Sequence, residues 1–397
     1  MQQYDFAIVG GGMVGATLAL ALATLNATGG RAPRILLLEA QTPNFGHHPG
    51  FDARSIALSY GSERVLTSLG LWSAFSHAFS PISSIHVSDQ THFGRVELNS
   101  EEYQLPHLGC VVELQQVGLA LYRRIQQCPA IDLVAPSRLA QLTLRSECVE
   151  LSTSEQQYQA RLLLLADGGH SQWREQLQIP VHEEPYEQSA VVANVRASAL
   201  PIGRAWERFT AGGPIALLPM TDRRLSLVWS QPHAAAHECQ QLSDEAFIAR
   251  LQREFGFRAG RFSEVGERHL YPLILRHAQE IYRHRTLLIG NAAHLLHPVA
   301  GQGFNLAVRD IAQLVCTLQA GWCVEQDPGA LVLLQTYAHG READVLRTIS
   351  MTSSLARLFA TSIPSVSMGR SLLLGAMNRS SFFKQWFAEQ ALGMRAS

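Results

Sequence analysis

Residues 5–15 read Asp5-Phe6-Ala7-Ile8-Val9-Gly10-Gly11-Gly12-Met13-Val14-Gly15, and Ile35-Leu36-Leu37-Leu38-Glu39 follows after an alanine- and leucine-rich run. An apolar strand, a glycine turn, a helix and a second strand that ends in an acid form the βαβ fingerprint of dinucleotide binding. A glycine motif alone is a weak signal, but here the whole unit is present. The stretch therefore predicts an α/β, Rossmann-like domain that binds a dinucleotide.

Each residue of this fingerprint has a physical task. Gly10 permits the tight turn from strand to helix, Gly12 lets the backbone approach a pyrophosphate, and Gly15 lets helix and strand pack closely. The helix N-terminus offers free N–H groups and a partial positive charge to the phosphates. Glu39 can accept hydrogen bonds from ribose hydroxyls and disfavours a 2′-phosphate, which favours FAD or NAD over NADP as the bound dinucleotide.

The composition is that of a slightly apolar globular protein with about two domains. Of 397 residues, 47% are hydrophobic and 16% are charged, and the formal net charge of −1 gives no support for nucleic-acid binding. The six cysteines are scattered without metal-ligand spacing, which predicts reduced thiols in a cytoplasm and no metal site. Residues 6–30 carry no charge, but their glycine cluster predicts a buried strand and helix rather than a membrane span.

Two later segments also run from a strand into a helix. The apolar run 160–166 ends in Asp167-Gly168-Gly169-His170-Ser171-Gln172-Trp173-Arg174, and the run 286–289 ends in Gly290-Asn291, followed by Pro298 and Gly301-Gln302-Gly303. Alone, each would be an ordinary turn. Together with the fingerprint they predict further contacts to a cofactor. Arg54 follows the βαβ unit and either reaches that cofactor or caps a surface loop.

The remaining periodicities predict the other elements. Alternation predicts a hairpin within 81–105, and Ser243 is the expected N-cap of a helix over 243–255. Further helices are expected at 58–70 and 111–127, and strands at 131–134, 139–144, 148–153, 161–166, 190–195 and 225–229. Residues 330–390 are expected to be mostly helical. From Met351 onward the chain is apolar and basic, which predicts either a helical cap with a solvated face or a surface for a membrane or a partner.

Together, the three glycine-containing segments resemble the class A flavoprotein monooxygenases of the para-hydroxybenzoate hydroxylase type. That family carries a GxGxxG fingerprint, a DGxxSxxR segment, and a GD segment followed by PxxGxG, in the order found here over residues 5–310. Within the family the chain is most similar to the ubiquinone-biosynthesis hydroxylases, especially those that act on a 2-polyprenyl-6-methoxyphenol. Residues 50–58, 86–89, 111–114 and 290–310 carry that similarity.

The resemblance implies a role for each matching position. It places Gly10, Gly12 and Gly15 at the FAD pyrophosphate, with Asp167 near the pyrophosphate and Glu39 at the adenosine ribose. Arg54 would lie on the flavin side, and Gly290 and Asn291 at the ribityl chain or phosphates. Pro298, Gly301 and Gly303 would lie along the flavin where oxygen reacts. Asn291 stands where most relatives carry Asp, and Glu113 stands where they often carry a flavin-contacting Arg or Gln. No general base is assigned, and His294 and His297 are expected to be structural.

The implied reaction is hydroxylation of a polyprenylated phenol in ubiquinone biosynthesis through a flavin C4a-hydroperoxide. FAD is then the bound cofactor, NAD(P)H a transient reductant and O2 the co-substrate. The alternatives are another flavoenzyme on the same scaffold, such as an epoxidase, a reductase or a hydroxylase of a different ring position, and a flavin-containing assembly subunit of a biosynthetic complex. The expected location is cytoplasmic, including the periphery of the inner membrane, and the expected partners are a membrane surface or proteins of that complex.

The predicted organisation has three parts. A discontinuous FAD-binding domain covers 1–78, 107–178 and 270–322, and an inserted β-sheet substrate domain covers 79–106 and 179–269. A C-terminal helical region covers 323–397.

Overall fold

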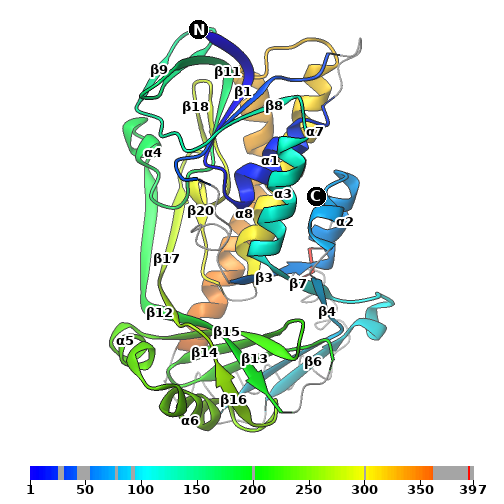
Figure 1. Ribbon diagram of the computed structural model, residues 1–397, viewed down its shortest axis with the longest axis vertical. Coiled ribbons are helices and arrows are strands. Elements are labelled where there is room, and N and C mark those ends of the chain that lie inside the picture. Colours follow the sequence, from blue (N-terminus) through cyan, green and yellow to red (C-terminus); the bar gives the residue numbers. More distant parts are fainter. Residues whose placement is uncertain are drawn as a thin grey trace.

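The fold is built on two large sheets with a small third sheet between them (Figure 1). The computed structural model describes residues 1–25, 31–42, 54–76, 79–90, 94–198, 202–298, 301–360 and 392–393. The mixed α/β class that the fingerprint predicts is confirmed.

The first sheet has β1 (Gln2–Val9) at its centre, as the fingerprint requires. Its parallel neighbours are β2 (Ile35–Leu38) and β11 (Gln157–Leu165), and the outer parallel strands are β8 (Ile131–Val134) and β19 (Thr286–Leu288). Antiparallel strands extend this sheet, namely β9 (Gln141–Leu144), β10 (Val149–Ser152) and β18 (Tyr282–Arg283). The carboxyl ends of β1, β2 and β11 therefore meet at one edge, where open α/β sheets bind their ligands.

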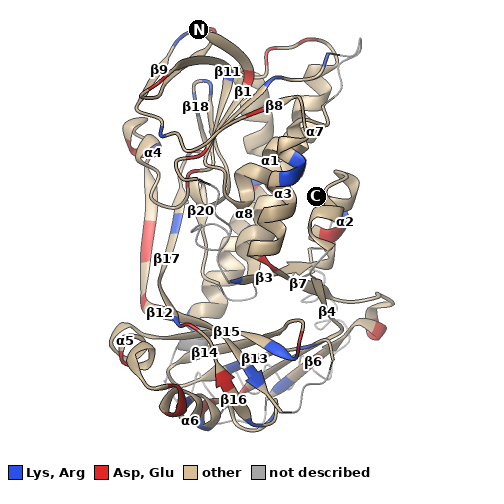
Figure 2. Ribbon diagram, viewed as in Figure 1, with Lys and Arg blue, Asp and Glu red and all other residues tan. Residues whose placement is uncertain are grey.

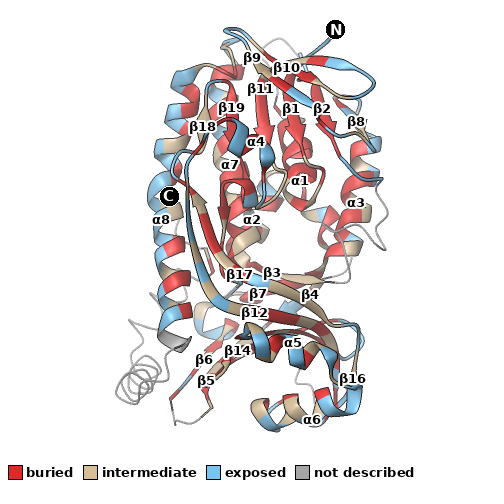
Figure 3. Cartoon of the chain, turned by 90° about the vertical axis from the view of Figure 1, so that its left-hand side faces the viewer, coloured by how far each residue is buried: buried red, intermediate tan, exposed pale blue. Residues whose placement is uncertain are grey.

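Both faces of this sheet are covered, which explains why its strands read as continuous apolar runs. Phe6 and Ile8 pack against helices on one face, whereas Ala7 and Val9 face β9, β10 and α4 (Gln172–Gln176) on the other. The helical face consists of α1 (Met13–Leu22), α3 (Leu114–Gln126) and α7 (Gln302–Trp322), with α8 (Leu331–Ala360) packed outside α7. In Figure 3, α1 and the central strands are buried.

The second sheet forms the opposite end of the molecule. Its strands in spatial order are β20 (His294–Leu295), β17 (His269–Ala278), β12 (Val181–Ala197), β15 (Arg224–Pro232), β14 (Gly213–Pro219), β13 (Arg204–Thr210), β5 (Ser84–Asp89) and β6 (Arg95–Asn99), with β16 (Phe262–Val265) beside β12. The hairpin predicted within 81–105 is the antiparallel pair of β5 and β6. The long strands β12 and β17 run between the two ends (Figure 1).

Two helices cover the outer face of the second sheet. They are α5 (His233–Gln241) and α6 (Asp244–Phe255), and Phe247 packs edge-on against Trp229 with their ring centroids 6.0 Å apart. The predicted cap of α6 is confirmed, because the Ser243 hydroxyl accepts a hydrogen bond from the backbone N–H of Ala246. The inner face of the sheet is left to face the first domain.

The third sheet is antiparallel and joins β3 (Ser55–Ser59), β7 (Gly109–Glu113) and β4 (Phe79–Ile82). Two helices predicted from sequence begin later than expected because of it. Residues 55–59 and 109–113 pair with each other as strands, so α2 (Tyr60–Ser68) and α3 begin only after them. Short 3₁₀ turns complete the described elements, namely η1 (Trp72–Ala74), η3 (Ser100–Tyr103) and η4 (Gly290–Ala292).

A buried charge network joins α7 to α8. Arg341 donates to Asp310 at 2.7 Å and to Asp344 at 2.6 Å, Arg309 also donates to Asp344, and His294 lies 2.7 Å from the other oxygen of Asp310. Burial raises the pKa of Asp310, but His294 and Arg341 outweigh it and hold that pKa below its ordinary value. The helix that covers the first domain is therefore fixed by paired charges as well as by apolar packing.

Most of the apolar, basic C-terminus lies outside the described residues, including Arg370, Arg379, Lys384 and Arg395. The two readings of that segment, a helical cap or a surface for a membrane or partner, therefore stay predictions, as do the three domain limits. Over the described elements, acidic and basic residues are interspersed (Figure 2).

We expect Arg341→Met to lower the free energy of unfolding by about 3–5 kcal/mol, because it leaves the buried carboxylate of Asp310 without its arginine partner. The matched control is Arg357→Met, which removes an ion pair with Glu184 whose arginine side chain is 62% exposed, and its effect should be small. Denaturant unfolding of both variants measures the difference. Equal losses would show that the network contributes no more than a surface pair.

Candidate active site

A cavity of about 1440 Å³ lies where the three sheets meet. Its walls include the glycine turn after β1, the start of α7, β3 and the inner face of the second sheet. Pockets for one small molecule usually measure about 300–1,000 Å³. The cavity is therefore large enough for a dinucleotide and a second molecule beside it.

The three fingerprint glycines divide into two kinds. A Cβ on Gly10 (φ +102°) would lie 2.5 Å from the carbonyl oxygen of Ala166, and a Cβ on Gly15 would lie 1.9 Å from that of Gly10. A Cβ on Gly12 would meet nothing within 4 Å, and Gly12 lines the cavity. The protein's own packing thus requires glycine at the first and third positions, whereas the second leaves open space for a ligand.

The start of α1 forms a cradle that suits an anion. Gly12 is its N-cap without a side-chain hydrogen bond, and its first turn carries no acid, so the partial positive charge of the helix end is not offset there. Glu39 lines the cavity, and its carboxylate also accepts hydrogen bonds from the N–H groups of Gly11 (2.6 Å) and Gln41 (2.8 Å). The Tyr122 hydroxyl donates to the Gly11 carbonyl at 2.8 Å, a support that sequence reasoning missed.

Asp167 supplies a buried acceptor at the cavity wall. Its Oδ2 accepts a hydrogen bond from the Ser171 hydroxyl at 2.8 Å, whereas its Oδ1 has no partner among the described residues. Burial raises the pKa of Asp167 above its ordinary value. A buried acceptor without a partner is costly. Its position therefore fits a hydroxyl donor such as those that a dinucleotide carries.

Arg174 joins the second and third segments. Its guanidinium donates to the carbonyl of Ala292 at 2.9 Å and to that of Gly169 at 3.1 Å. Arg276 on β17 donates to the same Gly169 carbonyl at 2.6 Å. The Asp-Gly and Gly-Asn segments, far apart in sequence, are thereby held side by side.

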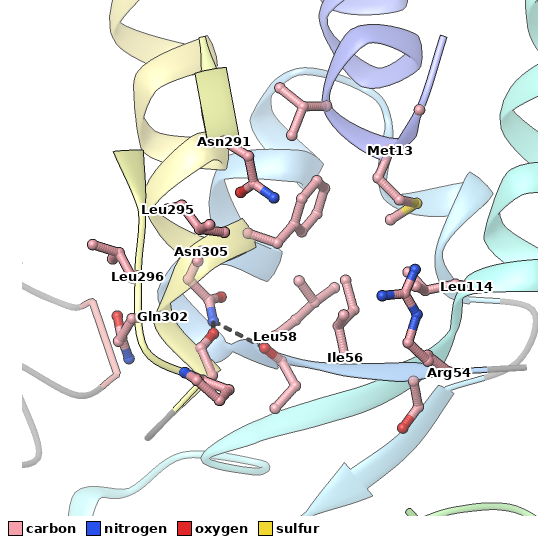
Figure 4. Close-up of a pocket in the computed structure, with 18 of the residues that line it drawn as sticks. Met13, Arg54, Ile56, Leu58, Leu114, Asn291, Leu295, Leu296, Gln302 and Asn305 are labelled. Atoms are coloured by element: carbon pink, nitrogen blue, oxygen red, sulfur yellow. Dashed lines mark hydrogen bonds between the residues drawn. The ribbon is translucent and has the colours of Figure 1, made fainter. Parts of the chain in front are cut away.

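The Gly-Asn turn packs directly on the fingerprint helix. Gly290 has φ +63°, and a Cβ there would lie 2.9 Å from a methyl carbon of Val14. Gly290 and Gly15 therefore lie behind the cavity wall, while Asn291 lines the cavity and points into it (Figure 4).

The start of α7 is fixed by Asn305. Its amide donates to the carbonyls of Gly301 (2.6 Å) and Ala57 (2.9 Å) and accepts from the Ser59 N–H (2.8 Å), which ties the helix to β3 (Figure 4). Pro298, Gly301 and Gly303 line the cavity at this point, and Gly301 is the N-cap with φ +60°. Sequence reasoning missed Asn305, whose only signal was an amide in the first turn of an apolar helix.

Arg54, which precedes β3, lines the cavity. Its guanidinium carbon lies 4.8 Å from the ring centroid of Tyr271, and its side chain points up from β3 toward Met13 and the start of α1 (Figure 4). The cofactor contact that the resemblance implies for Arg54 stays a prediction.

Three further polar residues that the sequence singled out, Glu113, His294 and His297, do not line the cavity. Glu113 accepts a hydrogen bond from Arg224 at 2.8 Å and so joins β7 to the second sheet. His294 is paired with Asp310, and His297 packs against the ring of Tyr186, where burial lowers its pKa to about 4. These contacts support the expectation that both histidines are structural.

The far end of the cavity is apolar apart from one carboxylate. Its wall on the second sheet consists of aliphatic and aromatic residues from β5, β6, β13, β14 and β15, namely Ile85, Val87, Val96, Leu98, Ala205, Trp206, Phe209, Ala216, Leu218 and Val228. Glu207 interrupts this wall, and burial raises its pKa to about 7. Sequence reasoning missed Glu207, although it alternates with Ala205 and Phe209 on the same face of its strand.

Comparisons with known proteins find relatives over nearly the whole chain. A family model described as an FAD binding domain matches residues 3–352. The chain is 36% identical to ubiquinone hydroxylase UbiL of Rhodospirillum rubrum, covering 98% of this chain and 89% of that one. It is 30% identical to the 3-demethoxyubiquinol 3-hydroxylase of Escherichia coli, over 99% of both chains. The solved structure of p-nitrophenol 4-monooxygenase from Pseudomonas putida shares the fold, with a TM-score of 0.81 at 17% identity over the full length of both chains.

We expect Gly12→Ala to weaken FAD binding at least about tenfold while the FAD-free protein folds normally, because its Cβ enters only the open space of the cavity. Gly15→Ala should instead lower the melting temperature of the FAD-free protein, because its Cβ would overlap the Gly10 carbonyl. Thermal unfolding and quenching of flavin fluorescence measure the two effects separately. Wild-type FAD affinity in Gly12→Ala would contradict a pyrophosphate site there.

We expect Asn291→Asp to retain FAD and to make the flavin reduction potential more negative. The side chain faces the cavity, and an added negative charge there opposes the uptake of electrons by a nearby flavin. Spectroscopic redox titration against a reference dye measures the shift, and Asn291→Gln controls for altered shape without a charge. An unchanged or raised potential in Asn291→Asp would place Asn291 away from the flavin.

Proposed function

This chain belongs to the FAD-dependent aromatic hydroxylases and to their ubiquinone-biosynthesis branch, and from that membership we propose that it hydroxylates the ring of a polyprenylated phenol of the 2-polyprenyl-6-methoxyphenol type. The observation that carries this proposal is the shape of the cavity. One continuous space joins the glycine cradle to an apolar wall that holds a single carboxylate.

The apolar end of the cavity supports a substrate with a prenyl tail. Beyond the second sheet, Leu355 of α8 and Leu392 near the C-terminus also line it, and Leu392 packs with Val96, Leu98 and Phe209. Burial of such surface stabilises a bound tail by about 25 cal/mol per Å². A ring at the polar boundary and a tail along this wall would use the two kinds of lining that the cavity offers.

The residues of the chain divide the work of the reaction. When bound, FAD supplies the redox chemistry that links NAD(P)H, O2 and the ring. The N-terminus of α1 and Gly12 would hold its pyrophosphate, Glu39 its ribose, and Asp167 and Asn291 its hydroxyls. The apolar wall would orient the ring and keep water from the reacting atoms.

The tail also bears on where the protein works. Among the described residues, no helix is long and apolar enough to cross a bilayer. A polyprenyl phenol partitions into lipid, so we infer that the chain meets its substrate at a membrane surface or receives it from a partner protein of the pathway.

We expect a short-chain 2-prenyl-6-methoxyphenol to stimulate NAD(P)H oxidation by the FAD-loaded protein and to gain one oxygen atom from ¹⁸O2. Mass spectrometry of the product measures the label. Oxidation of NAD(P)H that phenols do not stimulate would favour a reductase or an assembly role, and oxygen placed on the tail would favour an epoxidase.

The length of the substrate's prenyl tail provides a second expectation. Each added isoprene unit should lower KM at least several-fold with little change in kcat, because the apolar wall binds the tail equally in ground and transition states. Steady-state kinetics with zero, one and two isoprene units measure this, with 2-methoxyphenol as the tail-free control. A KM that does not depend on tail length would place the tail outside the cavity.

A further inference from the structure

We propose that Glu207 binds the ring hydroxyl of the substrate and accepts its proton during hydroxylation. This assignment rests on the proposed function and gives the reaction the base that the sequence left unnamed. It starts from a carboxylate that stands alone in an apolar wall of the cavity.

The register of the second sheet places Glu207 in the middle of a row. Glu207 on β13 lies opposite Val87 of β5 on one side and Ala216 of β14 on the other. The row continues to Val96 of β6 beyond Val87 and to Val228 of β15 beyond Ala216. Paired residues of neighbouring strands share a face, and all five line the cavity. Glu207 is therefore the single polar side chain in a row of five.

Glu207 has no hydrogen bond or ion pair within the described part of the chain. The two arginines near it in sequence are paired elsewhere, because Arg204 is bound to Glu97 and Arg208 donates to Ser88 and to the Glu254 carbonyl. The side chain is enclosed by protein yet partly accessible, which means that it opens to the cavity. A largely buried carboxylate without a hydrogen bond is costly unless a ligand that enters the cavity donates one to it.

The chemistry of the site selects a phenolic hydroxyl as that partner. An ionised carboxylate is an acceptor only, so it requires a donor on the ligand. An apolar molecule with one hydroxyl places that donor at Glu207 and the rest of its surface on Val87, Ala216 and Val228. In the transfer, the phenol O–H bond breaks, a new O–H bond forms on the carboxylate, and the electron pair left on oxygen enriches the ring for attack on the oxygen donor.

The electrostatic setting of Glu207 suits a proton acceptor near neutral pH. Burial alone raises its pKa to about 7. The residues next to it on its face of β13, Ala205 and Phe209, are uncharged, as are its partners on β5 and β14. The charged or titratable residues in the rest of the cavity lining belong to the fingerprint, the residue before β3 and the loops around the first sheet, namely Glu39, Arg54, Arg138, Asp167 and His170.

The test compares Glu207→Gln, which keeps the shape and loses the proton acceptor, with Glu97→Gln on β6 of the same sheet, whose carboxylate is paired with Arg204 and does not line the cavity. The probe is the short-chain 2-prenyl-6-methoxyphenol. In the wild type, kcat/KM for hydroxylation should rise with pH through about 7, because Glu207 must be ionised to accept the proton. Glu207→Gln should bind FAD normally, lose about a hundredfold or more in hydroxylation at pH 8, and lose the pH step.

Two further measurements separate a proton acceptor from a structural residue. Glu207→Asp should keep the pH step at a lower plateau, and Glu97→Gln should behave as wild type. Because its pKa is raised on folding, Glu207 favours the folded state most at low pH and least above pH 7. The melting temperature of the wild type relative to Glu207→Gln should therefore fall as pH rises from 5 to 8.

The outcomes distinguish this proposal from the function on which it rests. A wild-type protein that hydroxylates no phenol overturns both. Hydroxylation by the wild type together with an unchanged rate and pH step in Glu207→Gln overturns only the role of Glu207, and so does a pH step that disappears equally in Glu97→Gln.

Discussion

The close approach of α1 to the end of β1 is the constraint on which the site depends. No side chain can stand between Gly15 and the Gly10 carbonyl, and none can stand between Gly10 and the Ala166 carbonyl. These two contacts draw the helix start, β1 and β11 to one point. The N-terminal amides of α1, Glu39 after β2 and Asp167 after β11 then necessarily surround the same space. Packing inside the protein thus builds the cradle before any ligand enters.

The rest of the cofactor end is assembled by side chains that reach backbone carbonyls. Arg174 brings the Asp-Gly and Gly-Asn turns together, and Asn305 ties the start of α7 to β3. Such bonds satisfy backbone carbonyls that the loops themselves would leave unpaired. They also explain how loops, rather than regular elements, can hold fixed positions around a cofactor. The precision of the site therefore comes from a few buried donors placed behind its wall.

The sequence singled out several residues that line the glycine end of the cavity but not Glu207 in its apolar wall, for a physical reason. Close backbone packing requires glycine at Gly10 and Gly15, so their spacing, together with the apolar runs on either side, predicts the turn and the helix. Asn305, Tyr122 and Glu207 act through contacts with distant segments, and nothing local distinguishes an amide, a phenol or a carboxylate that does so. The start of α3 was placed too early for the same reason, because the pairing of β7 with β3 overrides the helical periodicity of residues 111–113.

The two ends of the cavity treat negative charge in opposite ways. At the first end, Glu39 accepts hydrogen bonds from backbone N–H groups, and the N-terminus of α1 offers a partial positive charge. Negative charge there is therefore compensated. At the second end, the strand partners of Glu207, Val87 and Ala216, are apolar, so its charge is opposed by burial and its pKa rises to about 7. A group held near its titration point exchanges a proton with little change in free energy. The apolar wall therefore disfavours a permanently ionised carboxylate but allows one that takes up and releases a proton during a reaction.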